Sequence, residues 1–163
     1  ARSLRQAFKN GEDYAAREDM ALVSLYGGLA LANAKLGAVH GFAGPFGGMF
    51  DAPHGAVCAT LLPYVMAMNV QALQARQPES ESLARYDEIA QILTANPNAT
   101  AADGVAWVQQ LCNDLQVPAL GAYGLTEDDF PDLIEKSKRA SSMKGNPIAL
   151  TDEELETILS QAI

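Results

Sequence analysis

The sequence contains few positive charges: 11 Lys and Arg residues stand against 20 Asp and Glu residues, which gives a formal net charge of -9. Proteins that bind the phosphate backbone of nucleic acids derive their affinity from clustered cations, so this composition argues against a nucleic-acid partner. An acidic surface is also not attracted to anionic lipids. We therefore expect neither a nucleic-acid partner nor a membrane partner.

Cysteines and long apolar runs are scarce too. Cys58 and Cys112 are far apart and form no CxxC pair, so we interpret both as small core hydrophobes in a reducing cytoplasm. The most apolar run, residues 20–32, is shorter than the ~20 residues needed to cross a bilayer. The start has no basic-then-apolar signal peptide. These features predict a cytoplasmic location.

Alternating strand patterns are missing, and apolar residues follow helical spacing almost everywhere. With 163 residues and 48% apolar content, the chain is long enough to form one domain with a buried core. Three segments resemble capping boxes, which mark the starts of helices: Thr100–Asp103, Thr126–Asp129 and Thr151–Glu154. The sequence therefore predicts an all-α, multi-helix bundle, with a short irregular helix within residues 39–50 and longer helices at about 13–35, 54–76, 82–93, 100–115, 130–140 and after 151.

The predicted helix at residues 13–35 has an unusual second half, because residues 20–32 are apolar on every side. A helix without a polar face is normally buried on all sides. Gly27 and Gly28 lower its helix propensity, so we expect another element to pack closely against its backbone. The first eight residues lack an initiator Met and look like the tail of a helix already under way. We therefore expect this chain to be a piece of a longer one.

The only two histidines, His40 and His54, stand 14 residues apart in the most Gly-rich stretch, and a Gly follows each of them. Neutral imidazole is the commonest metal ligand in proteins. Spacing alone is also compatible with a hydrogen-bonding pair in the core or with surface residues, because motifs such as HExxH and CxxC are absent. Asp51, the one carboxylate between them, is a further candidate ligand, although its place before Pro53 favours capping of the next helix. No GxSxG nucleophile elbow and no GxGxxG dinucleotide motif is present.

Residues 16–69 resemble the iron-containing alcohol dehydrogenase family. The matching segments are Arg17–Met20, Asn33–His40, Gly47–Gly48, Pro53–Gly55, Leu62–Pro63 and Asn69, and the later Gly145–Pro147 also fits. The resemblance implies an amino-terminal α/β domain that binds NAD or NADP and a helical, dehydroquinate synthase-like carboxy-terminal domain. On this basis residues 1–163 form a single helical domain that lacks the nucleotide-binding domain and the first part of the helical domain.

The resemblance also implies a metal centre of Fe²⁺ or Zn²⁺ held by one Asp and three His residues. His40 matches the third ligand and His54 the fourth, while the other two lie upstream of this chain. In the full-length enzyme the metal would polarise an alcohol oxygen and hydride would pass to the nicotinamide, which interconverts alcohols with aldehydes or ketones. Many members have another histidine four residues after the third ligand, where this chain has Gly44. Either a water or a group elsewhere then relays the proton, or the substrate class differs from the usual alcohols.

Two other hypotheses remain open at the level of sequence. In the first, the chain is a non-catalytic helical module that binds a partner or itself. In the second, it belongs to the same family but reduces an oxo-acid such as maleylacetate. For the 163 residues alone we expect negligible dehydrogenase activity, weak metal affinity from two imidazoles, and self-association into a homo-oligomer through the apolar helix. The bulky residues near the histidines would either line a dry pocket or pack in the core: Phe42, Phe46, Met49 and Phe50.

Overall fold

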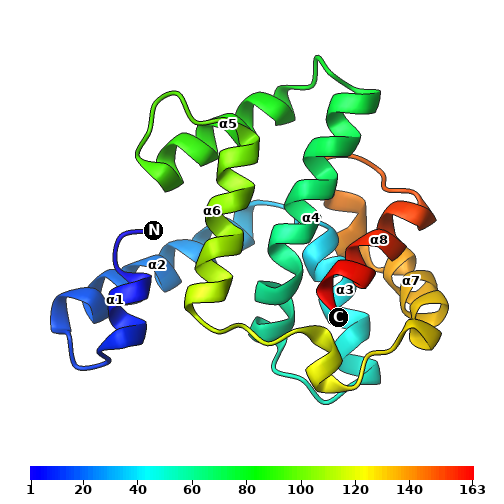
Figure 1. Ribbon diagram of the computed structural model, residues 1–163, viewed down its shortest axis with the longest axis horizontal. Helices are drawn as coiled ribbons and strands as arrows, with labels where there is room; N and C mark the ends of the chain where they lie inside the picture. The colour runs from blue at the N-terminus through cyan, green and yellow to red at the C-terminus, as the bar shows by residue number, and fades with distance from the viewer.

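A computed structural model describes all residues from 1 to 163, and they form helices with no strand, which confirms the predicted all-α class (Figure 1). The predicted helices appear within a few residues of their expected bounds. The α-helices are α1 (Leu4–Lys9), α2 (Tyr14–Asn33), α3 (Ala38–Met49), α4 (His54–Arg76), α5 (Glu81–Thr94), α6 (Ala101–Asp114), α7 (Phe130–Arg139) and α8 (Asp152–Ala162). Short 3-10 turns lie between them: η1 (Leu120–Tyr123), η2 (Glu127–Asp129) and η3 (Ser141–Gly145).

Helix α4 lies at the centre of the bundle, with α3, α6 and α8 packed around it and α7 against α3 and α8 (Figure 1). The main core is formed by apolar side chains from α3, α4, α7 and α8 and from the segment around η1, including the fully buried Phe42, Leu61 and Leu133. On α8, the side chains that helical spacing predicts to face inward are buried: Leu155, Ile158 and Leu159. Residues from Ala38 to Ala162 therefore share one core, to which α1 and α2 contribute no residue.

Helix α4 is long and apolar enough to pass a length-and-composition test for a membrane span. However, 56% of its most apolar 18-residue window is buried against the rest of the protein. This burial accounts for its apolar composition without a bilayer, as expected for the central helix of a bundle.

Helix α4 also continues through Pro63, which has no N–H to donate to the carbonyl oxygen of Ala59 one turn earlier. The Sγ of Cys112 on α6 lies 3.4 Å from that carbonyl oxygen and donates a hydrogen bond to it. Cys112 is half-buried and its pKa is raised by burial, so it stays a neutral thiol. A side chain from a neighbouring helix thus replaces the donor that the proline removes.

The three predicted capping boxes are present: Thr100 with Asp103 opens α6, Thr126 with Asp129 opens the η2 turn that leads into α7, and Thr151 with Glu154 opens α8. The predicted cap of α4 by Asp51 is wrong, because no side chain caps that helix and Pro53 occupies its N-cap position. Asp51 lies two residues before the cap and is exposed to solvent. It is too far along the chain to reach the free N–H groups of the first turn.

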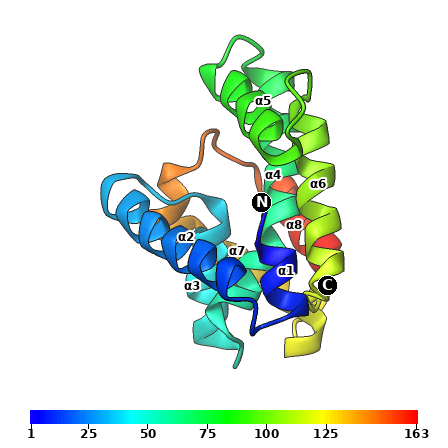
Figure 2. The same ribbon diagram turned by 90° about the vertical axis from the view of Figure 1, so that its left-hand side faces the viewer.

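The prediction that residues 20–32 are buried on all sides is wrong for this chain. Helix α2 lies at the edge of the bundle with α1 as its main neighbour, and Ala16 is its only buried residue (Figure 2). Within residues 22–31 of α2 the large apolar side chains are about half exposed, from 46% for Leu22 to 63% for Tyr26. Nothing lies within 4 Å of a side-chain position at Gly27 or Gly28, so the expected close packing is also missing. Composition correctly marks α2 as a helix suited to burial, but none of these 163 residues covers it.

The segment predicted as a short irregular helix is a regular α-helix of 12 residues, α3, that includes Pro45. Phe42 and Phe46 are completely buried in the main core, and Met49 and Phe50 pack against its edge. All four are therefore core side chains, and this packing anchors the helix that contains His40.

Candidate metal centre

The two histidines occupy the starts of two neighbouring helices. His40 lies in the first turn of α3 and His54 is the first residue of α4. Residues 50–53 form the connection between these helices, with extended backbone at Phe50 and Pro53. This connection and the packing of α3 on α4 bring the two imidazoles together, with ring centroids 5.4 Å apart and ring planes inclined by 53°.

The environments of the two rings differ. His40 is half-buried, whereas His54 is exposed to solvent. Burial, and to a lesser extent the nearby His54, lowers the pKa of His40 below its ordinary value of 6.5. His40 is therefore neutral at neutral pH, which is the form of imidazole that binds metal ions.

Cys58 lies beside this histidine pair and was missed as a site residue from the sequence. Its Sγ is 3.5 Å from Nε2 of His54, one helical turn earlier on α4. One potential ligand atom from each of His40, His54 and Cys58 lies within 4.8 Å of the others. Burial raises the pKa of the Cys58 thiol. The sequence signal that was overlooked is the spacing of His54 and Cys58, because residues four apart share one face of a helix. The interpretation of Cys58 as only a core hydrophobe is therefore incomplete.

A pair of hydrogen-bonded amides, the buried Asn69 and the half-buried Asn146, holds the start of α3, two residues before His40. The Oδ1 of Asn146 accepts a hydrogen bond from the Ala38 N–H at 3.0 Å, and its Nδ2 donates to Oδ1 of Asn69 at 2.7 Å. Asn69 is only 2% exposed, and its Nδ2 also donates to the Tyr86 hydroxyl at 3.1 Å. These bonds connect α3, α4, α5 and the loop after η3, so they restrict where His40 can lie.

Gly145, which precedes Asn146, is required because η3 packs closely against the segment that leads into α3. A Cβ atom on Gly145 would lie 2.0 Å from the carbonyl oxygen of Leu36, and one on Gly41 would lie 2.8 Å from Met143. Any larger residue would push η3 away from the start of α3. The Gly145–Pro147 segment therefore supports the histidine site, although it is distant from it in sequence.

An open cavity of about 490 Å³ lies next to His40, and His54 is not among its lining residues. Most of its lining residues are hydrophobic, Cys58 and Tyr86 among them, and its polar side chains include His40, Asn69 and Asn146. A mostly apolar cavity with a few converging polar groups is typical of a small-molecule site. Asp51 does not belong to the group of three donors, and Gly44 is exposed one turn after His40, so neither adds a ligand there.

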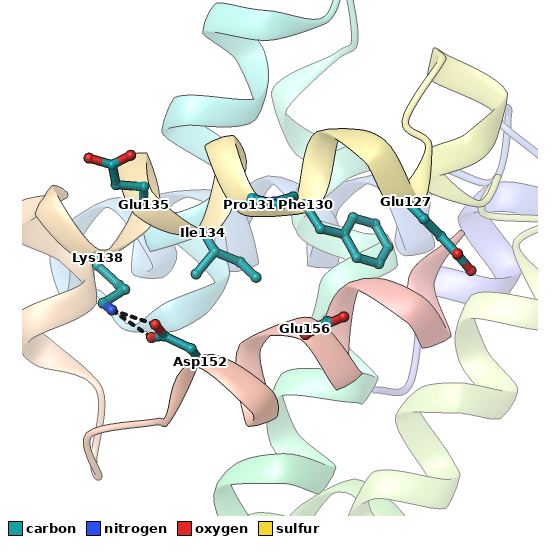
Figure 3. A pocket seen from close by; sticks show the side chains of 8 residues that line it. All are labelled: Glu127, Phe130, Pro131, Ile134, Glu135, Lys138, Asp152 and Glu156. Carbon is teal, nitrogen blue, oxygen red and sulfur yellow. Dashed lines mark hydrogen bonds and ion pairs between the residues drawn. The ribbon is translucent and has the colours of Figure 1, made fainter.

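A second cavity, of about 350 Å³, lies between α7 and α8 (Figure 3). Four of its lining residues are acidic, and one of them, Asp152, pairs with Lys138 at 2.6 Å. It contains no histidine or cysteine; its lining residues are Glu127, Phe130, Pro131, Ile134, Glu135, Lys138, Asp152 and Glu156. We assign no function to this cavity, because its exposed carboxylates are typical of a solvated helix surface.

Comparison with known proteins identifies the family of this chain. The model of the Fe-containing alcohol dehydrogenase family, C-terminal, matches residues 1–163. The chain is 35% identical to 1,3-propanediol dehydrogenase from Klebsiella pneumoniae, over 99% of this chain and 41% of that protein. It is 34% identical to alcohol dehydrogenase 4 from Schizosaccharomyces pombe, over 98% of this chain and 36% of that protein.

Solved structures show the same relationship. The chain matches an alcohol dehydrogenase from Oenococcus oeni with a TM-score of 0.83 and 32% identity, over 99% of this chain and 41% of that one. It matches a crystal structure of 1,3-propanediol oxidoreductase with a TM-score of 0.81 and 33% identity, over 99% of this chain and 42% of that one. The chain therefore spans about two fifths of the length of the relatives that it matches.

Proposed function

Because this chain belongs to the iron-containing alcohol dehydrogenase family, we propose that it is the C-terminal, metal-binding part of an NAD- or NADP-dependent dehydrogenase. The proposed reaction interconverts an alcohol with an aldehyde or ketone. The observation on which this proposal depends is the convergence of the His40 and His54 imidazoles from two helices, with ring centroids 5.4 Å apart. The proposed ligands are these two residues.

The donor set fits a divalent metal such as Fe²⁺ or Zn²⁺, which accept imidazole ligands. When bound, the metal supplies Lewis-acid chemistry at the substrate oxygen. The chain's own residues provide the remaining conditions. His40 presents a neutral imidazole because it is half-buried, the Asn146–Asn69 pair orients the start of α3, and the open cavity beside His40 offers a largely hydrophobic lining to a small substrate.

We propose that residues 1–163 form one helical domain and that upstream residues supply the nucleotide-binding domain, the other two ligands and a cover for α2. Two observations support this division. The chain spans only 41% of 1,3-propanediol dehydrogenase from Klebsiella pneumoniae. In addition, α2 exposes apolar side chains around its circumference, as a helix does when its packing partners belong to another part of the protein.

The substrate class follows from the relatives and the cavity together. Relatives are named for 1,3-propanediol and, in an NADPH-dependent enzyme, for butanol. A cavity of about 490 Å³ beside His40 is large enough for such small alcohols. We propose a small alcohol or the corresponding aldehyde as substrate.

We also propose a cytoplasmic location, a homo-oligomer, and no nucleic-acid or membrane partner. The proposal that no nucleic acid or membrane binds is supported by the net charge of -9.

The test uses the full-length protein that contains this chain. We expect His54→Ala and His40→Ala each to remove bound metal, measured by elemental analysis, and to abolish NAD(P)H oxidation with a small aldehyde. Asp51→Asn is the matched control, because this exposed carboxylate lies between the histidines but outside the donor group. Maleylacetate in the same substrate screen tests the oxo-acid alternative. Unchanged turnover and metal content in His54→Ala would refute the proposed function.

A further inference from the structure

We propose that the Tyr86 hydroxyl donates a hydrogen bond to a second oxygen of the substrate, so that this protein prefers small aldehydes and alcohols that carry a further hydroxyl or carboxylate group. Tyr86 is then a residue that determines specificity. This inference rests on the proposed function, because it takes the cavity of about 490 Å³ as the substrate site. It goes further by naming the substrate class of that site.

The direction of the hydrogen bonds that lead to Tyr86 is fixed by one backbone group. The Ala38 N–H can only donate, so the side-chain atom of Asn146 that lies 3.0 Å from it is the oxygen Oδ1. Asn146 therefore presents its Nδ2 to the Oδ1 of Asn69, at 2.7 Å. The Nδ2 of Asn69 then faces Tyr86 and donates to the hydroxyl oxygen at 3.1 Å. The Tyr86 oxygen is thus the acceptor of this bond.

The hydroxyl proton of Tyr86 is left without a partner. A phenol that accepts one hydrogen bond still has its own proton to donate, and Tyr86 donates it to no atom of the protein. Burial raises the pKa of Tyr86, and the hydrogen bond from Asn69 lowers it by less, so the oxygen keeps its proton at neutral pH. Tyr86 is half-buried and lines the cavity. The cavity therefore offers a free O–H donor.

The lining of the cavity contains no carboxylate that could accept this proton. None of its 16 lining residues is Asp or Glu, although the chain contains 20 of these residues. The lining includes Lys35, whose ammonium group is also only a donor. A cavity with donors and no carboxylate is complementary to a ligand that brings an acceptor oxygen of its own. A plain alkyl chain leaves the Tyr86 donor unpaired.

The Tyr86 side chain is also held at both ends. Its ring packs against a small buried cluster formed by Ala72, Leu73 and Ile148. Its hydroxyl is bonded to Asn69, which is only 2% exposed. A donor that is positioned in this way loses little conformational freedom when a ligand accepts its proton. The hydrogen bond can therefore discriminate between ligands that have the second oxygen and ligands that lack it.

The experiment measures steady-state reduction of two pairs of aldehydes by the full-length protein: propanal with 3-hydroxypropanal, and butanal with succinic semialdehyde. The members of a pair have the same number of carbon atoms, and the second member adds either a hydroxyl or a carboxylate. The two pairs thus distinguish the two sources of the second oxygen. We expect the unmodified protein to show the higher kcat/KM for the oxygen-bearing member of at least one pair.

Tyr86→Phe removes the donor and keeps the ring. It should raise the KM for the preferred oxygen-bearing aldehyde by roughly three- to tenfold relative to the plain aldehyde of the same pair. Tyr64→Phe is the matched control, because it removes the hydroxyl of another half-buried tyrosine, on α4, that does not line the cavity. It should leave this ratio unchanged. A purely structural effect of Tyr86→Phe would alter both members of a pair equally, so the ratio separates recognition from folding.

The outcomes also separate this inference from the proposed function. If the protein reduces aldehydes but Tyr86→Phe leaves the ratio in both pairs unchanged, the hydroxyl donates only to water or to other residues, and the inference is wrong while the proposed function stands. A preference of the unmodified protein for the plain member of both pairs contradicts the inference without any variant. If the unmodified protein reduces none of the four aldehydes, the proposed function itself is wrong.

Discussion

Replacement of Asn146 by Ala tests whether its amide pair with Asn69 positions the start of α3. The substitution removes four hydrogen bonds: two that Asn146 accepts, from Ala38 N–H at 3.0 Å and Asn69 Nδ2 at 3.2 Å, and two that it donates, to Asn69 Oδ1 at 2.7 Å and the Ile148 carbonyl at 2.9 Å. Each such bond contributes a net ~0.5–1.5 kcal/mol. The Oδ1 of Asn69, which is 2% exposed, also loses its donor where water has little access. We expect the free energy of unfolding to fall by roughly 2–4 kcal/mol, since the bond and desolvation contributions overlap.

The assay is equilibrium unfolding in urea, followed by far-ultraviolet circular dichroism. Asn33→Ala is the control, because the Asn33 amide donates only to the Leu29 carbonyl on the exposed surface of α2. It should change the free energy of unfolding by less than about 0.5 kcal/mol. A double-mutant cycle with Asn69→Ala should give a coupling energy of roughly 1–3 kcal/mol. If Asn146→Ala unfolds at the same urea concentration as Asn33→Ala, the argument that this pair holds α3 in place is refuted.

Three other predictions concern packing, capping and association. Gly104→Ala should destabilise the protein by roughly 1–2 kcal/mol, because the new methyl group would lie 2.9 Å from the Ala90 side chain. Gly28→Ala should stabilise α2 by about 0.5–1 kcal/mol, because nothing lies within 4 Å of its new methyl group. If thermal unfolding ranks the two variants the other way, the close contact between α5 and α6 is contradicted. The pKa of Asp103 is lowered by hydrogen bonds from the backbone N–H and then from the hydroxyl of its capping threonine, Thr100. The ionised carboxylate therefore stabilises the fold at pH values above its ordinary pKa of 3.8, and this stabilisation is lost as the pH falls below that value. Asp103→Asn should therefore flatten the dependence of unfolding on pH in this acidic range, and an unchanged profile would show that the cap contributes nothing. Leu25→Glu should reduce self-association of the isolated 163-residue chain, measured by sedimentation velocity, because Leu25 is 58% exposed on α2. If the unmodified chain is already monomeric at high concentration, association through this face of α2 is ruled out.

Local structure could be predicted from the sequence because it depends on interactions within about one helical turn. The capping threonines Thr100 and Thr151 mark the starts of α6 and α8, since each bonds to residues only three positions away. The inward face of α8 follows from spacing alone. The histidine pair was found for a different reason, because the segment around His40 and His54 resembles a family signature. The Asp51 cap failed although the helix begins where it was predicted, because Pro53 occupies the N-cap position and Asp51 lies two residues before it.

By itself, the sequence determined the all-α class, most helix bounds and the two histidines as candidate ligands. Only the tertiary structure decided that Cys58 lies beside them, because His40 belongs to another helix and its approach depends on how α3 packs on α4. The same holds for Asn69 and Asn146, which are 77 residues apart and meet only when the bundle is assembled. The exposure of α2 could not be predicted from the sequence either, because hydrophobicity indicates that a helix favours burial but not which residues cover it. Contacts between distant segments depend on the packing of whole helices, and no pattern within a single turn specifies that.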